Sequence, residues 1–261
     1  MMVESRGAIY VGVPGDEQYG SITCAVEVKH PSGRDLYAMS CQHVLSATLD
    51  PRAEEIRSGV RVSPVMSARP QVRVRHVASS SEYGGRVRAD GKPSFDVQLA
   101  RVMDREWLKG ALTTLRLSES QPFIPDRSTL EYIGARNGFE ILVPQNHPKY
   151  IATQRSSLAA NFRVCKSETL AISYTFSGAS ISVRHWLLGE LRVLGGVTTE
   201  PGDSGSAVIA RDADNACVLV GMHIAGDVRT GLAYFIPAFQ LFKPINYWNL
   251  PFGASMKPVN P

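Results

Sequence analysis

Short apolar and β-branched runs, separated by turn-forming residues, make up the pattern of this chain. Runs such as SITCAVEVKH, DLYAMSCQHVL, FDVQLARVM, ETLAISYTF, SISVRHWLLG and ACVLVGMHIAG alternate with segments rich in Gly, Pro, Asp and Asn. The segment HPSGRD between the first two runs predicts a hairpin. Helical periodicity is weak, with short candidates at SATLDPRAEEI and PAFQLFKPI. The pattern predicts an all-β protein, and many short strands are typical of barrels or sandwiches.

A polar, turn-rich stretch around residues 104–128 interrupts this strand pattern. It suggests two β-barrels joined by a linker, each of ordinary domain size. The expected divisions are an N-terminal extension (1–19), a first barrel (20–115), a linker (116–130), a second barrel (131–242) and a C-terminal tail (243–261).

The composition is that of a soluble globular protein, with 44% apolar residues, 20% charged residues and a net charge of +4. No run of apolar residues is long enough to span a membrane. The N-terminal stretch lacks a charged-then-apolar secretory pattern, so we expect a cytoplasmic protein or a trimmed chain.

The four cysteines, Cys24, Cys41, Cys165 and Cys217, are widely spaced and form no CxxC pair. We therefore expect neither a metal site nor a cofactor, and we expect free, buried thiols. Cys24 and Cys41 lie on two runs joined by a turn, which leaves a disulfide between them open.

A basic cluster extends from Val60 to Val77, where arginine alternates with valine in places. Alternation of this kind is typical of a half-buried strand with its arginines in water. A nucleic-acid surface is the alternative, but no aromatic residues are interleaved for base stacking. We expect a solvated face, and no nucleic-acid or membrane partner.

The stretch PGDSG places Ser204 between two glycines, ahead of an apolar run. A serine hydroxyl needs an adjacent base to become a nucleophile, and an acid must orient that base. His43 is the candidate base because it ends an apolar strand, and Asp96 is the candidate acid because it begins one. Asp104, just beyond the same run, is the weaker candidate. The remaining histidines lie in turns or in strand-like runs: His30, His76, His147, His185 and His223.

The segments SCQHVLSA, FDVQLARV and PGDSGSAVI resemble, in that order, the motifs of the chymotrypsin-like serine peptidases. The resemblance covers roughly Gly20 through Phe242. It implies two antiparallel six-stranded β-barrels with a short C-terminal helix. It also implies that His43 is the general base, Asp96 its orienting carboxylate and Ser204 the nucleophile. The backbone amides of Gly202 and Ser204 would form the oxyanion hole, because a tetrahedral intermediate needs preaimed donors.

The chain departs from this family at several positions. No activation site is evident, so Asp203, which in the family pairs with a new N-terminal amine, has no identifiable partner. Val44 replaces the cysteine that usually follows the histidine. Ile224 stands where the family often has a serine, so that support for Asp96 is missing.

The run VLVGMHIAG places His223 on the expected wall of the specificity pocket, and Thr199 lies five residues before Ser204. This pair resembles the pocket of glutamyl endopeptidases and of chymotrypsin-like viral main proteases. A charged His223 would favour a substrate Glu and a neutral one a Gln. Ile224 and Gly226 would offer backbone groups to an extended substrate. Arg229 is expected to be solvated, although it could add charge to the pocket.

We therefore expect a serine endopeptidase that cleaves after Glu or Gln, acting on a narrow protein or peptide substrate or on its own precursor, with a regulatory partner possible. A silent binding or scaffolding module with the same fold is the alternative from another class. An esterase would share the triad but needs a deep acyl pocket that the sequence does not indicate.

Overall fold

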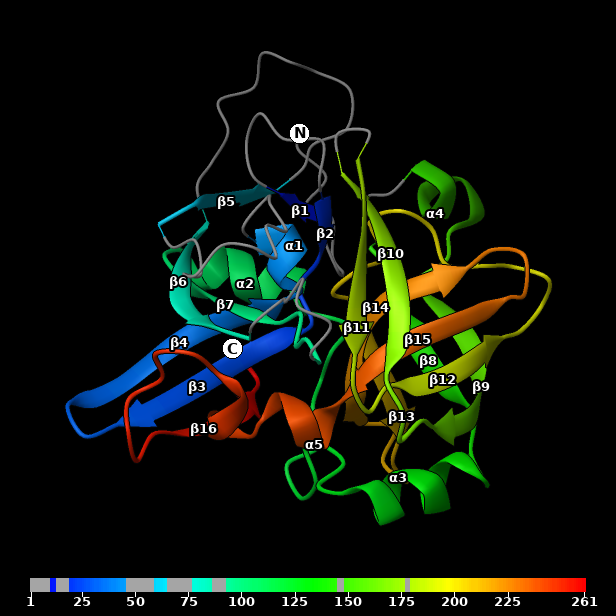
Figure 1. Ribbon diagram of the computed structural model, residues 1–261. Coiled ribbons are helices and arrows are strands. Elements are labelled where there is room, and N and C mark those ends of the chain that lie inside the picture. The colour runs from blue at the N-terminus through cyan, green and yellow to red at the C-terminus, as the bar shows by residue number, and fades with distance from the viewer. Residues whose placement is uncertain are drawn as a thin grey trace, which may run out of the picture.

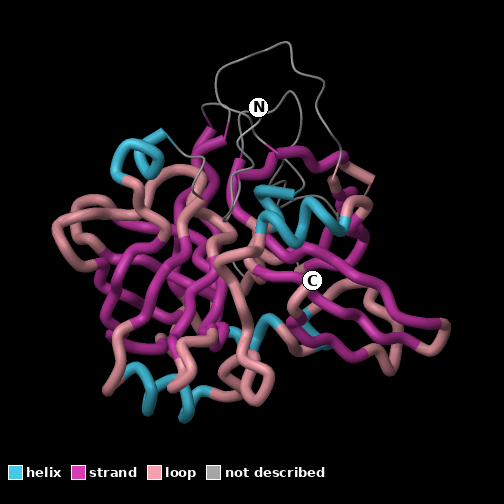
Figure 2. The backbone as a smooth tube through the Cα atoms, turned by 180° about the vertical axis from the view of Figure 1, so that it is seen from behind, coloured by secondary structure: helices cyan, strands magenta, loops and turns pink. Residues whose placement is uncertain are grey.

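The computed structural model describes residues 10–12, 19–45, 59–64, 77–85, 93–144, 148–176 and 179–261. Two groups of strands, one from each half of the chain, lie beside each other (Figure 1). The helices are short and lie around the edges of the two groups (Figure 2). The predicted fold class, all-β with two antiparallel β units, is confirmed.

The N-terminal group is an eight-stranded sheet with the order β16-β3-β4-β7-β6-β5-β1-β2. HPSGRD forms the predicted hairpin, in which β3 pairs antiparallel with β4. The strands are β1 (Tyr10–Gly12), β2 (Tyr19–Ser21), β3 (Cys24–His30), β4 (Gly33–Ser40), β5 (Arg61–Pro64), β6 (Ala78–Gly84), β7 (Gln98–Val102) and β16 (Ser255–Val259).

Two of these eight strands come from segments that the sequence pattern placed outside the barrels. β1 belongs to the predicted extension, and β16 belongs to the predicted tail. β16 pairs with β3 from Ser255↔Lys29 to Val259↔Ala25, so it satisfies the backbone groups of a strand that would otherwise be an edge. The resemblance implied six strands in this unit, and the sheet has eight.

The C-terminal group is a closed barrel with the order β12-β15-β14-β13-β8-β9, which matches the predicted six strands. Its interior is filled by large apolar side chains, among them Phe139, Ile141 and Phe235. The strands are β8 (Phe139–Leu142), β9 (Ser157–Cys165), β12 (Gly189–Val193), β13 (Ala207–Arg211), β14 (Cys217–Asp227) and β15 (Leu232–Pro237).

A hairpin of β10 (Leu170–Phe176) and β11 (Ala179–His185) forms a two-stranded sheet of its own, separate from the barrel. It lies between the two groups in Figure 1. A parallel bridge joins Ser94 to His185, and the amide of Ser94 donates to the carbonyl oxygen of Arg184 at 2.7 Å. The hairpin of the C-terminal half is thus attached to the segment that carries Asp96.

The helices connect these sheets. Asp104 accepts a hydrogen bond from the amide of Trp107 (2.9 Å) and caps α2, so the weaker acid candidate has a structural role there. The predicted helix at PAFQLFKPI is realised as α5 followed by a 3₁₀ turn, and the one at SATLDPRAEEI lies outside the described residues. The helices are α1 (Gln42–Leu45), α2 (Arg105–Ala111), α3 (Arg127–Gly134), α4 (Pro148–Thr153), α5 (Ala238–Leu241) and η1 (Pro244–Asn246).

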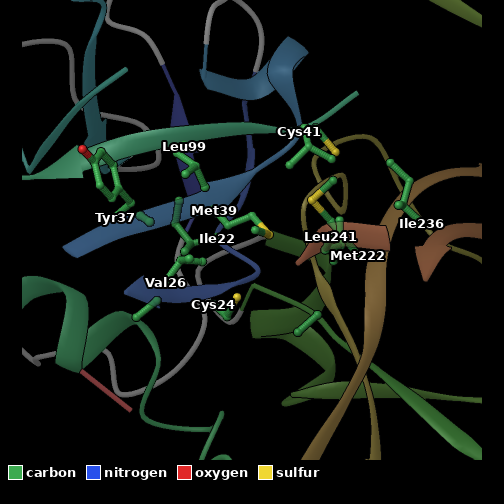
Figure 3. Close-up of a cluster of buried hydrophobic side chains, with 14 of the residues drawn as sticks. Ile22, Cys24, Val26, Tyr37, Met39, Cys41, Leu99, Met222, Ile236 and Leu241 are labelled. Atoms are coloured by element: carbon green, nitrogen blue, oxygen red, sulfur yellow. The ribbon is translucent and has the colours of Figure 1, made fainter. Parts of the chain in front are cut away.

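One apolar core joins the two halves. Figure 3 shows Val26, Met39 and Leu99 of the N-terminal sheet in the same cluster as Met222 and Ile236 of the barrel. Close packing of this kind resists relative movement of the packed elements. It therefore holds the loops of both halves in fixed register around the site between them.

The cysteines are free and buried, as predicted. Within the described part of the chain, no helix is long and apolar enough to cross a membrane. Of the basic cluster, Arg61 lies exposed on β5, whereas Arg69, Arg73 and Arg75 lie outside the described residues, as do His76 and His147.

Candidate active site

His43 lies in the single turn of α1, directly after β4. Its neighbours Val44 and Leu45 are fully buried, and both of their amides bond to the carbonyl oxygen of Cys41 (3.1 and 3.2 Å). These contacts anchor the turn in the core. The imidazole, held by this anchored backbone, is directed toward Asp96.

Asp96 is completely buried and bonds twice to His43. His43 Nδ1 lies 2.7 Å from Asp96 Oδ2, and the His43 amide donates to Asp96 Oδ1 at 3.3 Å. Burial raises the pKa of the Asp96 carboxyl, but the charge and hydrogen bonds of His43, together with the charge of His185, outweigh burial and lower this pKa overall. An ionised Asp96 holds the proton on Nδ1 and leaves Nε2 as the basic nitrogen.

Ser204 lies in the turn that leads into β13 and is partly exposed, whereas Asp203 and Ser206 beside it are fully buried. Its carbonyl oxygen accepts from the amide of Ser21 at 2.7 Å, which ties the turn to the N-terminal sheet. Gly205 (φ +86°) makes the close approach possible, because a Cβ there would lie 2.1 Å from the Ser21 carbonyl oxygen.

The same contacts bring Ser204 to the His43 turn. A Cβ on Gly20 would lie 2.4 Å from Val44 Cγ2 and 2.5 Å from the Ser204 carbonyl oxygen, so both segments meet at this glycine. The Ser204 hydroxyl donates to the carbonyl oxygen of Ile224 at 3.2 Å. Rotation about a single side-chain torsion would redirect it, and catalytic hydrogen bonds in free enzymes are often formed only with substrate.

The turn ahead of Ser204 contains a glycine with a positive φ. Gly202 has φ +99°, a conformation that side chains rarely adopt. The amide of Asp203 turns away to the carbonyl oxygen of Glu200 (3.0 Å). Within the described ranges, the amides of Gly202 and Ser204 have no acceptor in the protein. Those two donors are the ones expected to bind a developing oxyanion.

Asp203 has a partner that the sequence did not reveal. Tyr150 of α4 donates its hydroxyl to Asp203 Oδ2 at 2.6 Å, and the Glu200 amide donates to the same oxygen at 2.8 Å. Tyr150 and Asp203 are both buried. The partner of Asp203 that could not be identified from the sequence is therefore Tyr150. The uncharged hydroxyl of Tyr150, 53 residues before Asp203 in the sequence, contacts this carboxylate where the resemblance implied an N-terminal amine.

Asp96 also has support that the sequence reasoning missed. The hydroxyl of Tyr174 on β10 donates to Asp96 Oδ2 at 3.2 Å, and His185 Nε2 on β11 lies 2.9 Å from the same hydroxyl. The support that seemed lost at Ile224 is supplied by Tyr174 instead. The sequence shows only that Tyr174 and His185 lie within strand-like runs. Tyrosines and histidines in such runs are too common to identify a supporting residue.

His223 on β14 is buried, and burial, with a smaller contribution from the charge of His43, lowers its pKa to about 4. A hydrogen bond to the Tyr234 backbone opposes that change, and Nδ1 has no partner among the described residues. The donating nitrogen is therefore Nε2. At neutral pH the ring is uncharged, and its remaining nitrogen can only accept a hydrogen bond.

Thr199 is buried against Gly226, where a Cβ would lie 1.9 Å from Thr199 Oγ1. Gly226 follows His223 by three positions on the same strand. Ile224 buries its side chain and turns its carbonyl oxygen to Ser204. Arg229 lies in the following turn, with its side chain 88% exposed, which agrees with the solvated interpretation.

Cys41, His43 and Asp96 are the one group in the described part of the chain whose ligand atoms lie close enough to hold a metal ion. Burial raises the pKa of the Cys41 thiol well above its usual value, and its sulfur lies 3.6 Å from the His223 carbonyl oxygen as a donor. A protonated thiol is a poor metal ligand. The chemistry of this group is that of a hydrogen-bonded acid–base pair.

No family model matches the chain, and no curated protein matches it. Among solved structures it is similar to the active form of the Rv3671c protease from M. tuberculosis, with 12% identity, 90% of this chain and 78% of that chain covered, and a TM-score of 0.40. The NS6 protease from murine norovirus 1 gives 12% identity, 90% coverage of both chains and a TM-score of 0.38. A chimeric, inactive form of murine norovirus NS6 gives 13% identity, coverage of 90% and 94%, and a TM-score of 0.37. These neighbours are chymotrypsin-like proteases of low sequence identity to this chain.

Proposed function

We propose that this protein is a serine endopeptidase that cleaves peptide bonds through an acyl-enzyme. The observation that carries the proposal is the buried His43–Asp96 pair, 2.7 Å apart, beside a partly exposed Ser204 on a glycine-flanked turn. Burial disfavours the charge of the Asp96 carboxylate, and its contacts with His43 offset that cost while they fix the carboxylate on one nitrogen of the imidazole.

In the proposed reaction, Ser204 Oγ attacks the scissile carbonyl carbon while its proton passes to His43 Nε2. The negative oxygen of the tetrahedral intermediate binds to the amides of Gly202 and Ser204. The C–N bond then breaks as Nε2–H protonates the leaving amine, which leaves an ester on Ser204. Water, deprotonated by Nε2, hydrolyses the ester and restores the serine.

We propose further that the residue before the cut is glutamine rather than glutamate. A neutral His223 whose Nε2–H is bound to Tyr234 can accept from a substrate amide but cannot donate to a carboxylate. The Thr199 hydroxyl would donate to the amide oxygen. The carboxylate of Glu would enter a buried pocket without a cation, which is unfavourable. The proposed enzyme would act on a narrow set of protein or peptide substrates or on its own precursor.

Labelling with a fluorophosphonate probe tests the nucleophile without knowledge of the substrate. The full chain is expected to be labelled, and Ser204→Ala to lose the label completely. Ser206→Ala is the matched control, because that serine lies on the same turn but is fully buried, and it should be labelled like the parent. An unlabelled parent chain would favour the competing function, a silent binding module, for which the Ser204–Ile224 hydrogen bond is the one structural argument.

The pocket is tested separately with peptide libraries that vary the residue before the cut. Cleavage after Gln in preference to Glu is expected at neutral pH. Preference for Lys, Arg or a large aromatic residue would overturn the pocket assignment and leave the serine mechanism intact.

A further inference from the structure

Four buried side chains form a continuous hydrogen-bonded row that extends beyond the proposed triad. It runs from His185 to Tyr174 (2.9 Å), from Tyr174 to Asp96 (3.2 Å) and from Asp96 to His43 (2.7 Å). Each of these four residues is less than a tenth exposed. Tyr174 also packs against both imidazoles, with ring centroids 5.2 Å from His43 and 5.9 Å from His185.

The proton positions in this row follow from what each group can donate. The ionised Asp96 can only accept, so the single hydroxyl proton of Tyr174 is directed to it. The Tyr174 oxygen must then accept from His185, which places the His185 proton on Nε2. Nδ1 of His185 is the acceptor nitrogen and has no partner among the described residues. A buried acceptor without a partner is less costly than a buried N–H without one, so this tautomer is consistent.

We propose that Tyr174 and His185 are positioning residues that hold the Asp96 carboxylate against His43 and share its negative charge. The proposal rests on the proposed function, because it concerns the acid of that triad. Neither residue touches the substrate; both act through Asp96. His185 orients the hydroxyl of Tyr174, and Tyr174 orients the carboxylate.

The hairpin of β10 and β11 can position Asp96 because two contacts, one from the backbone and one from side chains, join it to the segment that carries Asp96. The backbone bridge at Ser94 and the side-chain row at Asp96 lie two residues apart on the same segment. β10 and β11 pair only with each other in the described sheets. Their position is therefore set by this docking, and the alignment of the acid depends on it.

Among the described groups, the titratable side chains that face Asp96 are His43, Tyr174, His185 and Cys41. Burial lowers the pKa of His185 to about 4, and burial raises the pKa values of the Tyr174 hydroxyl and the Cys41 thiol well above their usual values. At neutral pH these three are uncharged. Tyr174 therefore withdraws charge from Asp96 only through its hydrogen bond.

Tyr174→Phe removes the hydroxyl and keeps the ring. The carboxylate then carries more negative charge, which favours the protonated imidazole beside it, so deprotonation of the base should require a pH about one unit higher. The midpoint of the fluorophosphonate labelling rate against pH should move upward by the same amount. Labelling should fall about tenfold below the midpoint and recover above it. Tyr132→Phe is the matched control, because Tyr132 is 60% exposed and far from this row in sequence, and it should leave the midpoint unchanged.

His185 supplies the second pair of variants. His185→Leu removes the donor to Tyr174 and should move the midpoint in the same direction. His185→Gln keeps an N–H donor and should have the midpoint of the parent chain. An NMR experiment that follows the His43 ring against pH in the Ser204→Ala background measures the same protonation midpoint without any turnover. It therefore separates this proposal from the proposed function, which fails if the parent chain is not labelled.

An unchanged His43 midpoint in a folded Tyr174→Phe protein, judged by its melting temperature, would overturn the proposal. If the Tyr174→Phe protein does not fold, the two His185 variants test the proposal instead. Equal midpoints for His185→Leu and His185→Gln would overturn it.

Discussion

The two buried aspartates of this site, Asp96 beside the N-terminal sheet and Asp203 beside the barrel, are both held by a tyrosine hydroxyl from the C-terminal half. Their second partners differ. Asp96 faces a histidine that can take a proton, whereas the Asp203 oxygen that Tyr150 contacts also accepts from a backbone amide. In the proposed function, Asp96 would serve proton transfer through His43, whereas Asp203 would hold the shape of the loop. Asp203 holds the turn whose amides would bind the oxyanion.

The largest effect is expected for Asp96→Asn. The amide would present an N–H to His43 or reverse its tautomer, so Nε2 would no longer be the basic nitrogen. The fluorophosphonate labelling rate should fall on the order of 10⁴-fold. Asp104→Asn is the control, because an asparagine still caps α2, and its labelling rate should be that of the parent. Comparable losses in both variants would contradict the assignment of Asp96.

Acid should destabilise the folded chain through its buried histidines, one of which, His185, belongs to the row that supports Asp96. His185 has a pKa of about 4 in the folded chain and an ordinary value of 6.5 when unfolded, so the unfolded chain binds the additional proton between these values. The contribution of His185 to stability is complete above pH 6.5, and it is lost progressively as the pH falls from 6.5 through about 4. The loss is about 3 kcal/mol in the free energy of unfolding for this residue, and His223 adds a similar loss.

Urea unfolding at a series of pH values measures this dependence. His185→Gln should lose its share of the decrease, because glutamine does not titrate, and Tyr150→Phe should keep the full decrease. Parallel curves for His185→Gln and the parent chain would contradict the buried, neutral His185.

Tyr150→Phe tests the Asp203 side directly. It removes a hydrogen bond to a buried carboxylate, which should cost about 1.5–3 kcal/mol of stability. The labelling rate should fall at all pH values, with no change in its midpoint, because no proton donor or acceptor of the triad is altered. A shifted midpoint would show that Asp203 is coupled to the base and would remove the distinction between the two aspartates.

The smallest effect is expected for Gly202→Ala. A side chain at φ +99° strains the backbone by about 1–2 kcal/mol, and the strain falls on the loop that carries the oxyanion donors. Gly195→Ala is the matched control, because Gly195 also has a positive φ (+75°) and has open space around it. Both variants should melt at lower temperature, but only Gly202→Ala should be labelled more slowly.

Much of the fold and of the site could be predicted from local sequence. The hairpin at HPSGRD, the turn around Ser204 and the position of His43 at a strand end are local features, since turn chemistry and alternation fix them within a few residues. The added strand β16 was missed because pairing with β3 links residues at opposite ends of the chain. An edge strand accepts whichever segment packing brings to it, and no local pattern encodes that choice.

The sequence by itself determined that this protein is all-β and that a histidine, an aspartate and a serine occur in contexts that suit a nucleophilic site. Only the tertiary structure decided what surrounds the two carboxylates. Tyr150 lies 53 residues from Asp203 and Tyr174 lies 78 residues from Asp96. A buried charge must find donors wherever the packed chain places them, and those donors carry no mark in the sequence.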